Sequence, residues 1–336
     1  MSKPVTLVTG AAGFIGSHLS RALLRAGHEV VALDDLSGGF QENLPPEAHW
    51  VQGSVDDPSS VNAVFKNFRL DYVYHAAAYA AEGLSHFIRR HNYQNNLVGS
   101  VNLINASVRS KVKCFVFFSS IAVYGRGQVP LHEETKPRPE DPYGISKLAV
   151  EMDLASAHSL FGLPYVIFRP HNVYGEYQNL NDQFRNVVGI FCRQLLLGQP
   201  LTVFGDGSQR RAFTYVEDIL PACLGCLTNP QSHGQVFNLG SDVPVTVLQM
   251  ANLLMEVSGI TSPITHLPER HEVPDAFSSH KKADLFFGSN PKTSLQEGIR
   301  RTWAWARTQK ISLRPLPFDL EISQKLPPSW AALLKP

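Results

Sequence analysis

A glycine-rich turn after the first apolar run constrains the fold of this chain more than any other feature. Val5 to Thr9 is a short, β-rich run, and Gly10-Ala-Ala-Gly13-Phe-Ile-Gly16 follows it directly. Phe14 to Arg25 then carries apolar residues at helical spacing. A strand, a glycine turn and a helix in this order predict one βα unit whose helix begins at the turn.

Further apolar runs of strand length alternate with helical stretches through the first half of the chain. The expected strands are His28 to Leu33, Trp50 to Gly53, Leu70 to His75, Lys113 to Ser119 and Pro164 to Phe168, and the expected helices are Pro58 to Phe68, Gly83 to Arg109 and Asp141 to Phe161. Such alternation predicts a doubly wound parallel sheet, a Rossmann domain, and therefore the α/β fold class. The charged fraction of 18% suits a large sheet that is buried on both faces.

The pattern changes after Arg169-Pro170, and we expect a smaller C-terminal α/β lobe that binds the substrate. A chain of 336 residues is long for one hydrophobic core. We therefore predict a first domain over residues 1–172 and a second lobe over 173–336, with a strand near 236–240 that returns to the first sheet. The elements expected in the second half are a loop at Tyr174 to Asp182, a helix near Asn186 to Leu197, strands at Leu201 to Phe204 and Val236 to Leu239, a helix at Thr246 to Val257, and a proline-rich loop or tail at Pro315 to Pro328.

The charge balance favours a small-molecule partner. Thirty basic and 29 acidic residues give a net charge of +1, so no overall field draws the chain to nucleic acid or anionic lipid. The apolar runs are far shorter than the roughly 20 residues that span a bilayer, and no signal-peptide pattern precedes the first strand, so we expect a cytoplasmic protein without a membrane segment. Four scattered cysteines predict no disulfide framework, and the 13 histidines lack metal-ligand spacing, so we expect no metal site.

The glycine turn predicts a dinucleotide site, and the residue that closes the next strand predicts which dinucleotide. Gly10 permits the tight turn, Gly13 lets the backbone approach a pyrophosphate, and Gly16 lets the helix pack on the sheet. Asp34 follows Gly16 by 18 residues, where a carboxylate would accept hydrogen bonds from ribose hydroxyls and repel the 2′-phosphate of NADP. We therefore predict NAD, with an ordinary turn and a solvated strand-end acid as the alternative interpretation. The cofactor-binding residues expected in this unit are Gly10, Gly13, Phe14, Ile15, Gly16 and Asp34.

A tyrosine and a lysine four residues apart predict a proton-transfer site. Tyrosine has a pKa near 10 in water and becomes a base only when cations stabilise its phenolate. Tyr143 and Lys147 would share one helix face, and Ser119-Ser120 ends a strand where α/β sheets place their ligands. Alone the pair would fit a surface helix equally well, but together with the serines it indicates a catalytic site.

At this point the chain resembles an extended short-chain dehydrogenase/reductase of the nucleotide-sugar epimerase and dehydratase group. The resemblance spans nearly the whole length, and five motifs in the family's order carry it. They are Thr9-Gly10-Ala-Ala-Gly13-Phe-Ile-Gly16, Ser119-Ser120-Ile-Ala-Val-Tyr124-Gly125, Tyr143-Gly-Ile-Ser-Lys147, Arg169-Pro-His-Asn172-Val-Tyr-Gly175 and Arg211-Ala-Phe-Thr-Tyr215-Val-Glu-Asp218.

The resemblance implies a reaction. Tyr143 would be the base, Ser120 would hydrogen-bond the reacting sugar hydroxyl, and Lys147 would anchor the nicotinamide ribose. Dehydratases of this group carry an added acid and base where this chain has Ile121 and Ala122, so the resemblance favours epimerisation. The implied reaction inverts C4 of a UDP-hexose, with UDP-glucose and UDP-galactose as the simplest pair, through a 4-keto sugar to which the hydride returns.

The resemblance also implies further contacts with cofactor and substrate. Asn95 would support the cofactor region, while Ser54 and Ser279-His280 depart from the residues that the family usually carries. The other cofactor-binding residues expected are Asp35, Ser37, Ser54, Val55, Ala76, Ala77, Ala78, Asn95, Ser119, Tyr143 and Lys147. In the family, arginines pair with the diphosphate and an acid holds the uridine ribose. The expected substrate-binding residues are Ser120, Tyr143, Asn172, Arg211, Arg270 and Glu272.

Several alternatives remain open from the sequence. Small Ala276 would admit UDP-N-acetylglucosamine, whereas Phe277 is one residue away, and Arg185 would hold the carboxylate of UDP-glucuronate. A nucleotide-sugar reductase and a non-catalytic NAD-binding module are the competing classes. Family members commonly form homodimers through the helices equivalent to Gly83 to Arg109 and Asp141 to Phe161, so a homodimer is expected.

Overall fold

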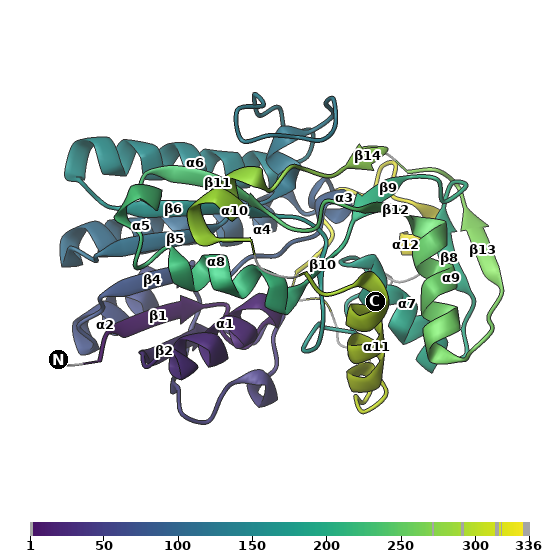
Figure 1. Cartoon of the computed structure of the whole chain (residues 1–336), viewed down its shortest axis with the longest axis horizontal. Helices are drawn as coiled ribbons and strands as arrows, with labels where there is room; N and C mark the ends of the chain where they lie inside the picture. Colours follow the sequence, from purple (N-terminus) through teal and green to yellow (C-terminus); the bar gives the residue numbers. More distant parts are fainter. Residues whose placement is uncertain (1–2, 271, 290–291, 313–315, 317, 332–336) are drawn as a thin grey trace.

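A computed structural model of the chain describes residues 3–270, 272–289, 292–312, 316 and 318–331. Its centre is a seven-stranded sheet with the order β11-β6-β5-β4-β1-β2-β3, in which all neighbouring strands run parallel (Figure 1). The predicted α/β fold class, with a doubly wound Rossmann sheet, is confirmed. The strands of the sheet are β1 (Val5–Thr9), β2 (Glu29–Asp34), β3 (His49–Gln52), β4 (Tyr72–His75), β5 (Cys114–Phe118), β6 (Tyr165–Pro170) and β11 (Gln235–Leu239).

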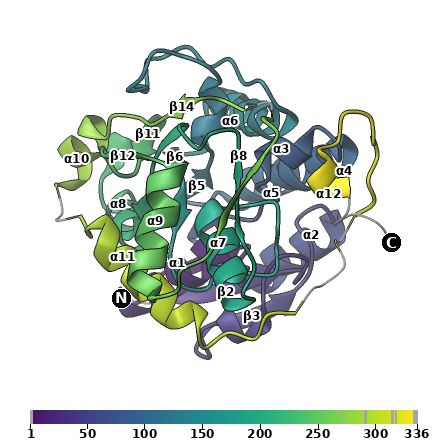
Figure 2. The same cartoon turned by 90° about the vertical axis from the view of Figure 1, so that its right-hand side faces the viewer.

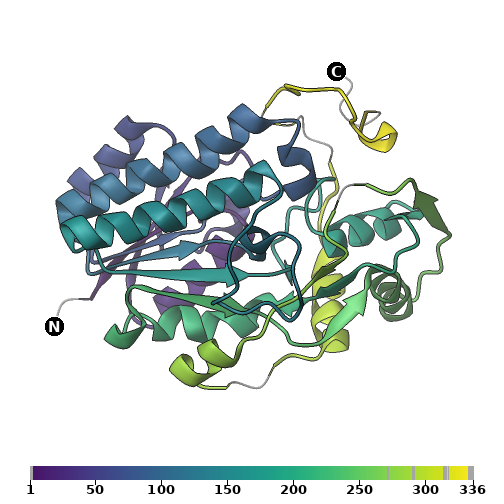
Figure 3. The same cartoon turned by 90° about the horizontal axis from the view of Figure 1, so that it is seen from above.

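Alternate residues of the strands supply two separate hydrophobic cores, one on each face of the sheet. Val8 and Val116 point into one core, while their neighbours Leu7 and Phe115 point into the other, as the two-residue period of a strand requires. One face is covered by α1 (Phe14–Arg25), α8 (Leu220–Gly225) and α10 (Lys281–Phe287), and the other by α2 (Pro58–Asn67), α5 (Gly99–Ser110) and α6 (Pro142–Phe161) (Figure 3).

The starts of α2 and α6 follow from their sequence. Each helix has a proline in its first turn, where no backbone N–H is needed, and an aspartate at the N-cap. The carboxylate of Asp57 accepts from the N–H groups of Ser59 and Ser60, and that of Asp141 accepts from Gly144 N–H at 2.9 Å. The Asp141 cap fixes the first turn of α6, which carries Tyr143.

The single helix expected from Gly83 to Arg109 is wrong. The structure instead has α3 (Glu82–Ser85), α4 (Arg89–Tyr93), a π-helical turn η2 (Gln94–Val98) and then α5. Ile88 has non-helical dihedral angles, and the carbonyl of Phe87 accepts hydrogen bonds from the C-terminal residues Glu321 and Ile322 instead of from the next helical turn. A distant segment of the chain therefore replaces the local helical hydrogen bonds.

Apart from β11, α8 and α10, the second half of the chain forms a smaller group of helices and strands beside the carboxyl ends of the sheet (Figures 1 and 2). The strand β11 lies beside β6 at the edge of the large sheet, and the buried residues of the smaller group pack into the same core as α1. The division into 1–172 and 173–336 stays a prediction, and parts of its second range lie outside the described residues. The remaining elements are β7 (Val173–Tyr174), α7 (Val187–Leu196), β8 (Leu201–Phe204), β9 (Arg210–Ala212), β10 (Thr214–Tyr215), β12 (Pro244–Thr246), α9 (Val247–Ser258), β13 (Ile264–Leu267), β14 (Asp275–Ala276), α11 (Leu295–Ala306), α12 (Pro328–Ala331) and the short turns η1 (Gln41–Asn43), η3 (Ile121–Tyr124), η4 (Val216–Ile219) and η5 (Pro230–Ser232).

Two features of the described residues bear on other classes of protein. In that part of the chain, no helix combines the length and apolar character that a membrane crossing needs. Within the same residues, no three His, Cys, Asp or Glu side chains are grouped as a metal site would require. The four cysteines are buried and free, and Cys223 lies in α8.

Candidate active site

A cavity of 680 Å³ opens at the carboxyl ends of β1, β4, β5 and β6 and extends to the second half of the chain. This is where doubly wound sheets bind their ligands, and its volume is in the range of small-molecule sites. With one exception, all predicted site residues line it. They are Gly10, Gly13, Phe14, Ile15, Gly16, Asp34, Asp35, Ser37, Val55, Ala76, Ala77, Ala78, Asn95, Ser119, Ser120, Tyr143, Lys147, Asn172, Arg211, Arg270 and Glu272.

Ser54 is the exception, because it does not line the cavity. Its hydroxyl donates to Asp35 Oδ2 at 3.1 Å, while Asp35 Oδ1 accepts from Ser37 N–H. Ser54 therefore holds the carboxylate of Asp35 in place, and its own contact with a cofactor stays a prediction.

The glycine turn leaves room for a ligand because side chains are excluded from it. Gly10 has a φ of 67°, and a Cβ atom there would lie 2.7 Å from Ala77 N. A Cβ atom on Gly16 would collide with the carbonyl oxygen of Gly10. The turn leads into α1 at Phe14, so the first amides of that helix face the cavity, as a pyrophosphate site requires.

Asp34 ends β2 at the edge of the same cavity. Its Oδ2 accepts from Ala12 N–H at 3.0 Å and its Oδ1 from Leu36 N–H at 2.8 Å. Burial raises the pKa of this carboxyl, and these backbone hydrogen bonds oppose the shift. The glycine turn, the open helix end and a buried strand-end acid together match what the diphosphate and adenosine ribose of NAD need.

Tyr143 and Lys147 lie on one face of α6, close to the end of β5. The Lys147 ammonium is 5.8 Å from the centre of the Tyr143 ring and donates to the Phe118 carbonyl at 2.8 Å. Burial raises the pKa of the Tyr143 hydroxyl, and a hydrogen bond with Ser120 lowers it. Burial also lowers the pKa of Lys147 to about 7. The structure thus brings Tyr143, Lys147 and Ser120 together in the cavity at the carboxyl end of β5.

A buried ion pair supports this group from behind. Glu151, one turn after Lys147 on α6, accepts from Arg169 Nε at 2.9 Å and from the hydroxyl of Ser119. Glu151 and Arg169 are only 6% and 4% exposed. The charge of Glu151 raises the pKa of Lys147 and so opposes the effect of burial. Glu151 therefore links Arg169 on β6 to Ser119 by hydrogen bonds. It also favours the charged form of Lys147.

The predicted substrate residues of the second half meet at the other end of the cavity. Arg270 Nη2 donates to Glu272 Oε2 at 2.9 Å, and Arg211 Nη2 lies 3.5 Å from the same oxygen. Gln209 also donates to Glu272, at 3.2 Å. Asn172 has a φ of 43° and reaches the cavity between the two ends. Two guanidinium groups and one carboxylate are therefore gathered where a diphosphate and a ribose would fit.

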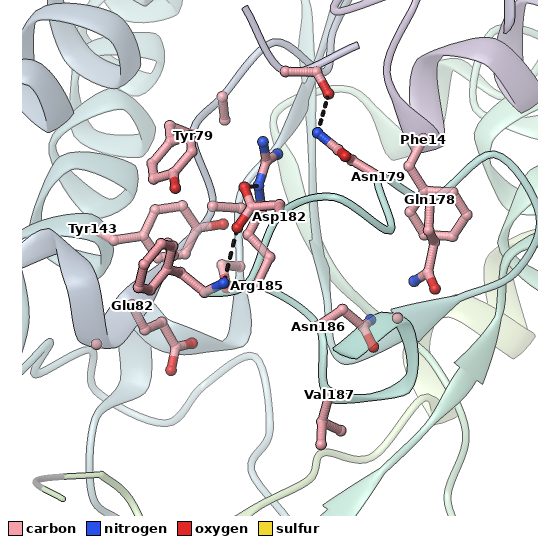
Figure 4. A pocket seen from close by; sticks show the side chains of 18 of the residues that line it. Phe14, Tyr79, Glu82, Tyr143, Gln178, Asn179, Asp182, Arg185, Asn186 and Val187 are labelled. Carbon is pink, nitrogen blue, oxygen red and sulfur yellow. Dashed lines mark hydrogen bonds and ion pairs between the residues drawn. The ribbon is translucent and has the colours of Figure 1, made fainter. Parts of the chain in front are cut away.

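The cavity also contains side chains to which the sequence assigns no role, such as Glu82. It further contains Arg185, which the sequence suggests only as a partner for the carboxylate of UDP-glucuronate. Arg185 Nε is bonded to Asp182 Oδ2, and its guanidinium lies 4.6 Å from the centre of the Tyr79 ring (Figure 4). Glu82 opens into the cavity on the side of Tyr143 (Figure 4). Enclosure by the protein, followed by the charge of Asp141, raises the pKa of Glu82 to about 7. No sequence motif marks these positions, because they meet only through the fold.

Ser279 and His280 lie outside the cavity lining. His280 is buried between His171, at 2.8 Å, and Asp242, at 2.6 Å. His280, one of the two residues that differ from the usual family residues, therefore takes part in a buried hydrogen-bond network. This network joins it to His171, the residue before Asn172.

Comparison with known proteins gives consistent results. The model of the NAD dependent epimerase/dehydratase family matches residues 6–240. A UDP-glucose 4-epimerase of Mycolicibacterium smegmatis is 32% identical over 312 residues, which are 90% of this chain and 99% of the relative. Among solved structures, a UDP-glucose 4-epimerase of Thermotoga maritima with UDP-glucose is 35% identical with a TM-score of 0.86, over 90% of this chain and 99% of that one. A UDP-glucuronic acid 4-epimerase of Bacillus cereus, in complex with UDP-glucuronic acid and NAD, is 28% identical with a TM-score of 0.83, over 90% and 99%.

Proposed function

Since the chain belongs to the NAD dependent epimerase/dehydratase family, an enzyme family, and has NAD as its cofactor, we propose that it inverts C4 of a UDP-hexose. The observation that carries the proposal is the meeting of Tyr143, Lys147 and Ser120 at the end of the sheet. Ile121 and Ala122 form a buried turn beside them and offer neither acid nor base for an elimination.

Each of the three residues has a role in moving one proton. Tyr143 takes the proton of the sugar 4-hydroxyl, and Ser120 holds that hydroxyl and the phenol oxygen in one hydrogen-bonded line. The Lys147 ammonium stabilises the phenolate by its charge, because burial in a low-dielectric site strengthens the attraction. NAD, which the glycine turn and Asp34 would hold, would supply the reversible hydride transfer at C4 of the sugar.

The diphosphate end of the substrate would be held by Arg211 and Arg270, and Glu272 would accept from the uridine ribose. Guanidinium groups bind phosphate through two parallel hydrogen bonds, which fixes its orientation as well as its position. Asn172 would contact the sugar diphosphate. Asn95, on the wall near Tyr79, would support the cofactor region.

The charges around Tyr143 favour a neutral hexose. Glu82, Asp141 and Asp182 line the cavity near Tyr143, and Arg185 in the same region is paired with Asp182. A carboxylate on the substrate would meet this acidic surface and be repelled. UDP-glucose and UDP-galactose are therefore the proposed substrates.

Two other sugars remain as alternatives within the same reaction. UDP-glucuronate is favoured by one observation, the guanidinium of Arg185, which acts on Tyr143 and is held by Asp182. The structure gives less support to UDP-N-acetylglucosamine, because neither Ala276 nor Phe277 lines the cavity. Phe277 instead packs under the guanidinium of Arg210.

A substrate panel tests the proposal. We expect purified protein, without added NAD, to interconvert UDP-glucose and UDP-galactose, and to turn over UDP-glucuronate at least about tenfold more slowly, the cost of roughly 1.4 kcal/mol of charge repulsion. The measurement is product separation by anion-exchange chromatography. Net formation or consumption of NADH would indicate a nucleotide-sugar reductase instead. A protein that retains NAD but turns over none of the sugars would indicate a non-catalytic NAD-binding module. Turnover of UDP-glucuronate alone, lost in Arg185→Met, would contradict the neutral-hexose assignment.

We also propose that the protein is a cytoplasmic homodimer. The family arrangement would pair α5 and α6 of two copies, and α6 carries apolar side chains on its outer surface. These are Ile145, Met152, Leu160 and Phe161, exposed by 41%, 67%, 73% and 63%. Free, buried cysteines suit a reducing compartment.

A charge on α6 tests the homodimer. We expect sedimentation to give twice the chain mass for the wild type and the monomer mass for Met152→Glu, because a carboxylate at the centre of an apolar interface is left without a partner. Asp153→Ala, at the next position along α6, which is half-buried, is the control. A monomeric wild type would contradict the dimer.

A further inference from the structure

The C-terminal residues 318–331, which we call the strap, fold back onto the cavity (Figures 2 and 3). The proline-rich sequence predicts only a loop or tail here, and two of its prolines, Pro315 and Pro317, lie outside the described residues. The strap instead belongs to a hydrophobic cluster that includes Leu84 of α3, Phe184, and Phe204 of β8, and Trp330 and Ser329 line the cavity.

One part of the strap is tied to α3 and α4 by hydrogen bonds. The N–H groups of Glu321 and Ile322 donate to the Phe87 carbonyl at 2.9 and 3.2 Å. The Glu321 carboxylate accepts from Arg90 N–H at 2.8 Å and from His91 N–H at 3.0 Å. These bonds use the polar backbone groups that the break between α3 and α4 leaves free.

The other part of the strap inserts Trp330 between the two halves of the chain. Its side chain is buried, with ring contacts to Phe87 at 6.3 Å, Phe184 at 5.4 Å and Phe204 at 6.2 Å. A Cβ atom on Gly83 would come within 2.9 Å of the ring, so the absence of a side chain there makes room for it. Trp330 therefore contacts α3 on one side and β8 on the other.

Trp330 also contacts the guanidinium of Arg270. The guanidinium carbon lies 4.5 Å from the centre of the Phe204 ring and 5.7 Å from that of Trp330. Arg270 Nη2 is bonded to Glu272, while its Nε is buried and has no hydrogen-bond partner among the described residues. Contact with the two aromatic rings holds the guanidinium in place and leaves its Nε–H group unused.

We propose that the strap completes the nucleotide end of the cavity and that Trp330 is a positioning residue for Arg270, which it holds ready for an anionic diphosphate. The inference rests on the proposed function, since a UDP-sugar supplies that diphosphate. Without the Trp330 ring, Arg270 keeps its charge but loses one of the two surfaces that fix its direction. The cost is therefore expected in substrate binding and not in the proton transfer at Tyr143.

The test compares Trp330→Ala and Trp330→Phe with the wild type by calorimetry with UDP alone. We expect Trp330→Ala to weaken UDP binding about tenfold, within the range of a buried cation–π contact, and Trp330→Phe to recover most of the affinity. In turnover, Trp330→Ala raises KM for the UDP-sugar and leaves kcat and the bound NAD unchanged. Ile322→Ala, an exposed side chain on the same strap, is the control and is expected to behave as the wild type.

Two outcomes would overturn the proposal: UDP binding to Trp330→Ala as tight as to the wild type, or a fall in kcat at unchanged KM. If Trp330→Ala does not fold, Glu321→Ala replaces it, because it removes only the carboxylate that bonds α4, and it is expected to weaken UDP binding while NAD is retained. A wild type that binds UDP but epimerises no UDP-sugar would contradict the proposed function, yet the effect of Trp330 on UDP affinity would still decide the role of the strap.

Discussion

The variant Tyr143→Phe is expected to lower the epimerisation rate about 1,000-fold, because it removes the hydroxyl that is proposed to take the proton of the sugar 4-hydroxyl. The ring remains, so the packing of α6 and the position of Lys147 are preserved. The structure indicates why the loss should be this large. Ser120 hydrogen-bonds the tyrosine but has no cation of its own to stabilise an alkoxide, so it cannot replace the phenolate.

The measurement is single-turnover and steady-state kinetics with UDP-galactose, together with the NAD content of the purified variant. Tyr72→Phe is the matched control, since Tyr72 lies on β4 away from the cavity and is expected to leave the rate unchanged. Epimerisation by Tyr143→Phe at the wild-type rate would exclude Tyr143 as the base. Loss of NAD from the variant would instead place its effect in cofactor binding.

The second large effect is expected from the buried ion pair behind the site. Glu151→Gln leaves the Arg169 guanidinium buried without a countercharge, and we expect the free energy of unfolding to fall by about 3 to 5 kcal/mol. Urea unfolding followed by circular dichroism measures this loss. The double variant Glu151→Leu with Arg169→Met, which removes both charges, is expected to recover much of the stability.

The same variant should also change the pH dependence of the reaction. Glu151 raises the pKa of Lys147, so its loss should move that pKa below the value of about 7. The charged form of a lysine is lost as the pH rises through its pKa. We therefore expect the alkaline limb of the rate profile to shift to lower pH in Glu151→Gln. An unchanged profile in a folded variant would contradict the link between Glu151 and Lys147.

The sequence predicted the regular part of the fold well because local signals determine it. Strand β1 and helix α1 have the predicted bounds, since an apolar run, a glycine turn and a helical repeat meet there. The interruption of the helix expected from Gly83 to Arg109 depends on hydrogen bonds from Glu321 and Ile322. Residues more than 200 positions away leave no periodic signal at the break.

The residues of the candidate site also fall into those that the sequence could predict and those that it could not. Gly10, Asp34, Ser120 and Tyr143 follow or begin elements at the carboxyl edge of the sheet, so their convergence follows from a parallel topology. Glu82 and the strap residue Trp330 could not be predicted, because neither lies in a motif and each reaches the cavity through tertiary packing. The sequence also could not show that the side chain of Ser54 donates to Asp35, because this contact depends on the packing of two loops.

The position of β11 has a consequence for any attempt to isolate the first domain. This strand covers the outer side of β6, whose six residues are all buried. A fragment that ends at residue 172 would expose β6 as an unpaired apolar edge strand, which is a template for aggregation. The segment between β6 and β11 is thus better regarded as an insertion into the sheet than as an appended unit. The predicted first domain therefore depends on β11, a strand that is synthesised only after the predicted second lobe has begun.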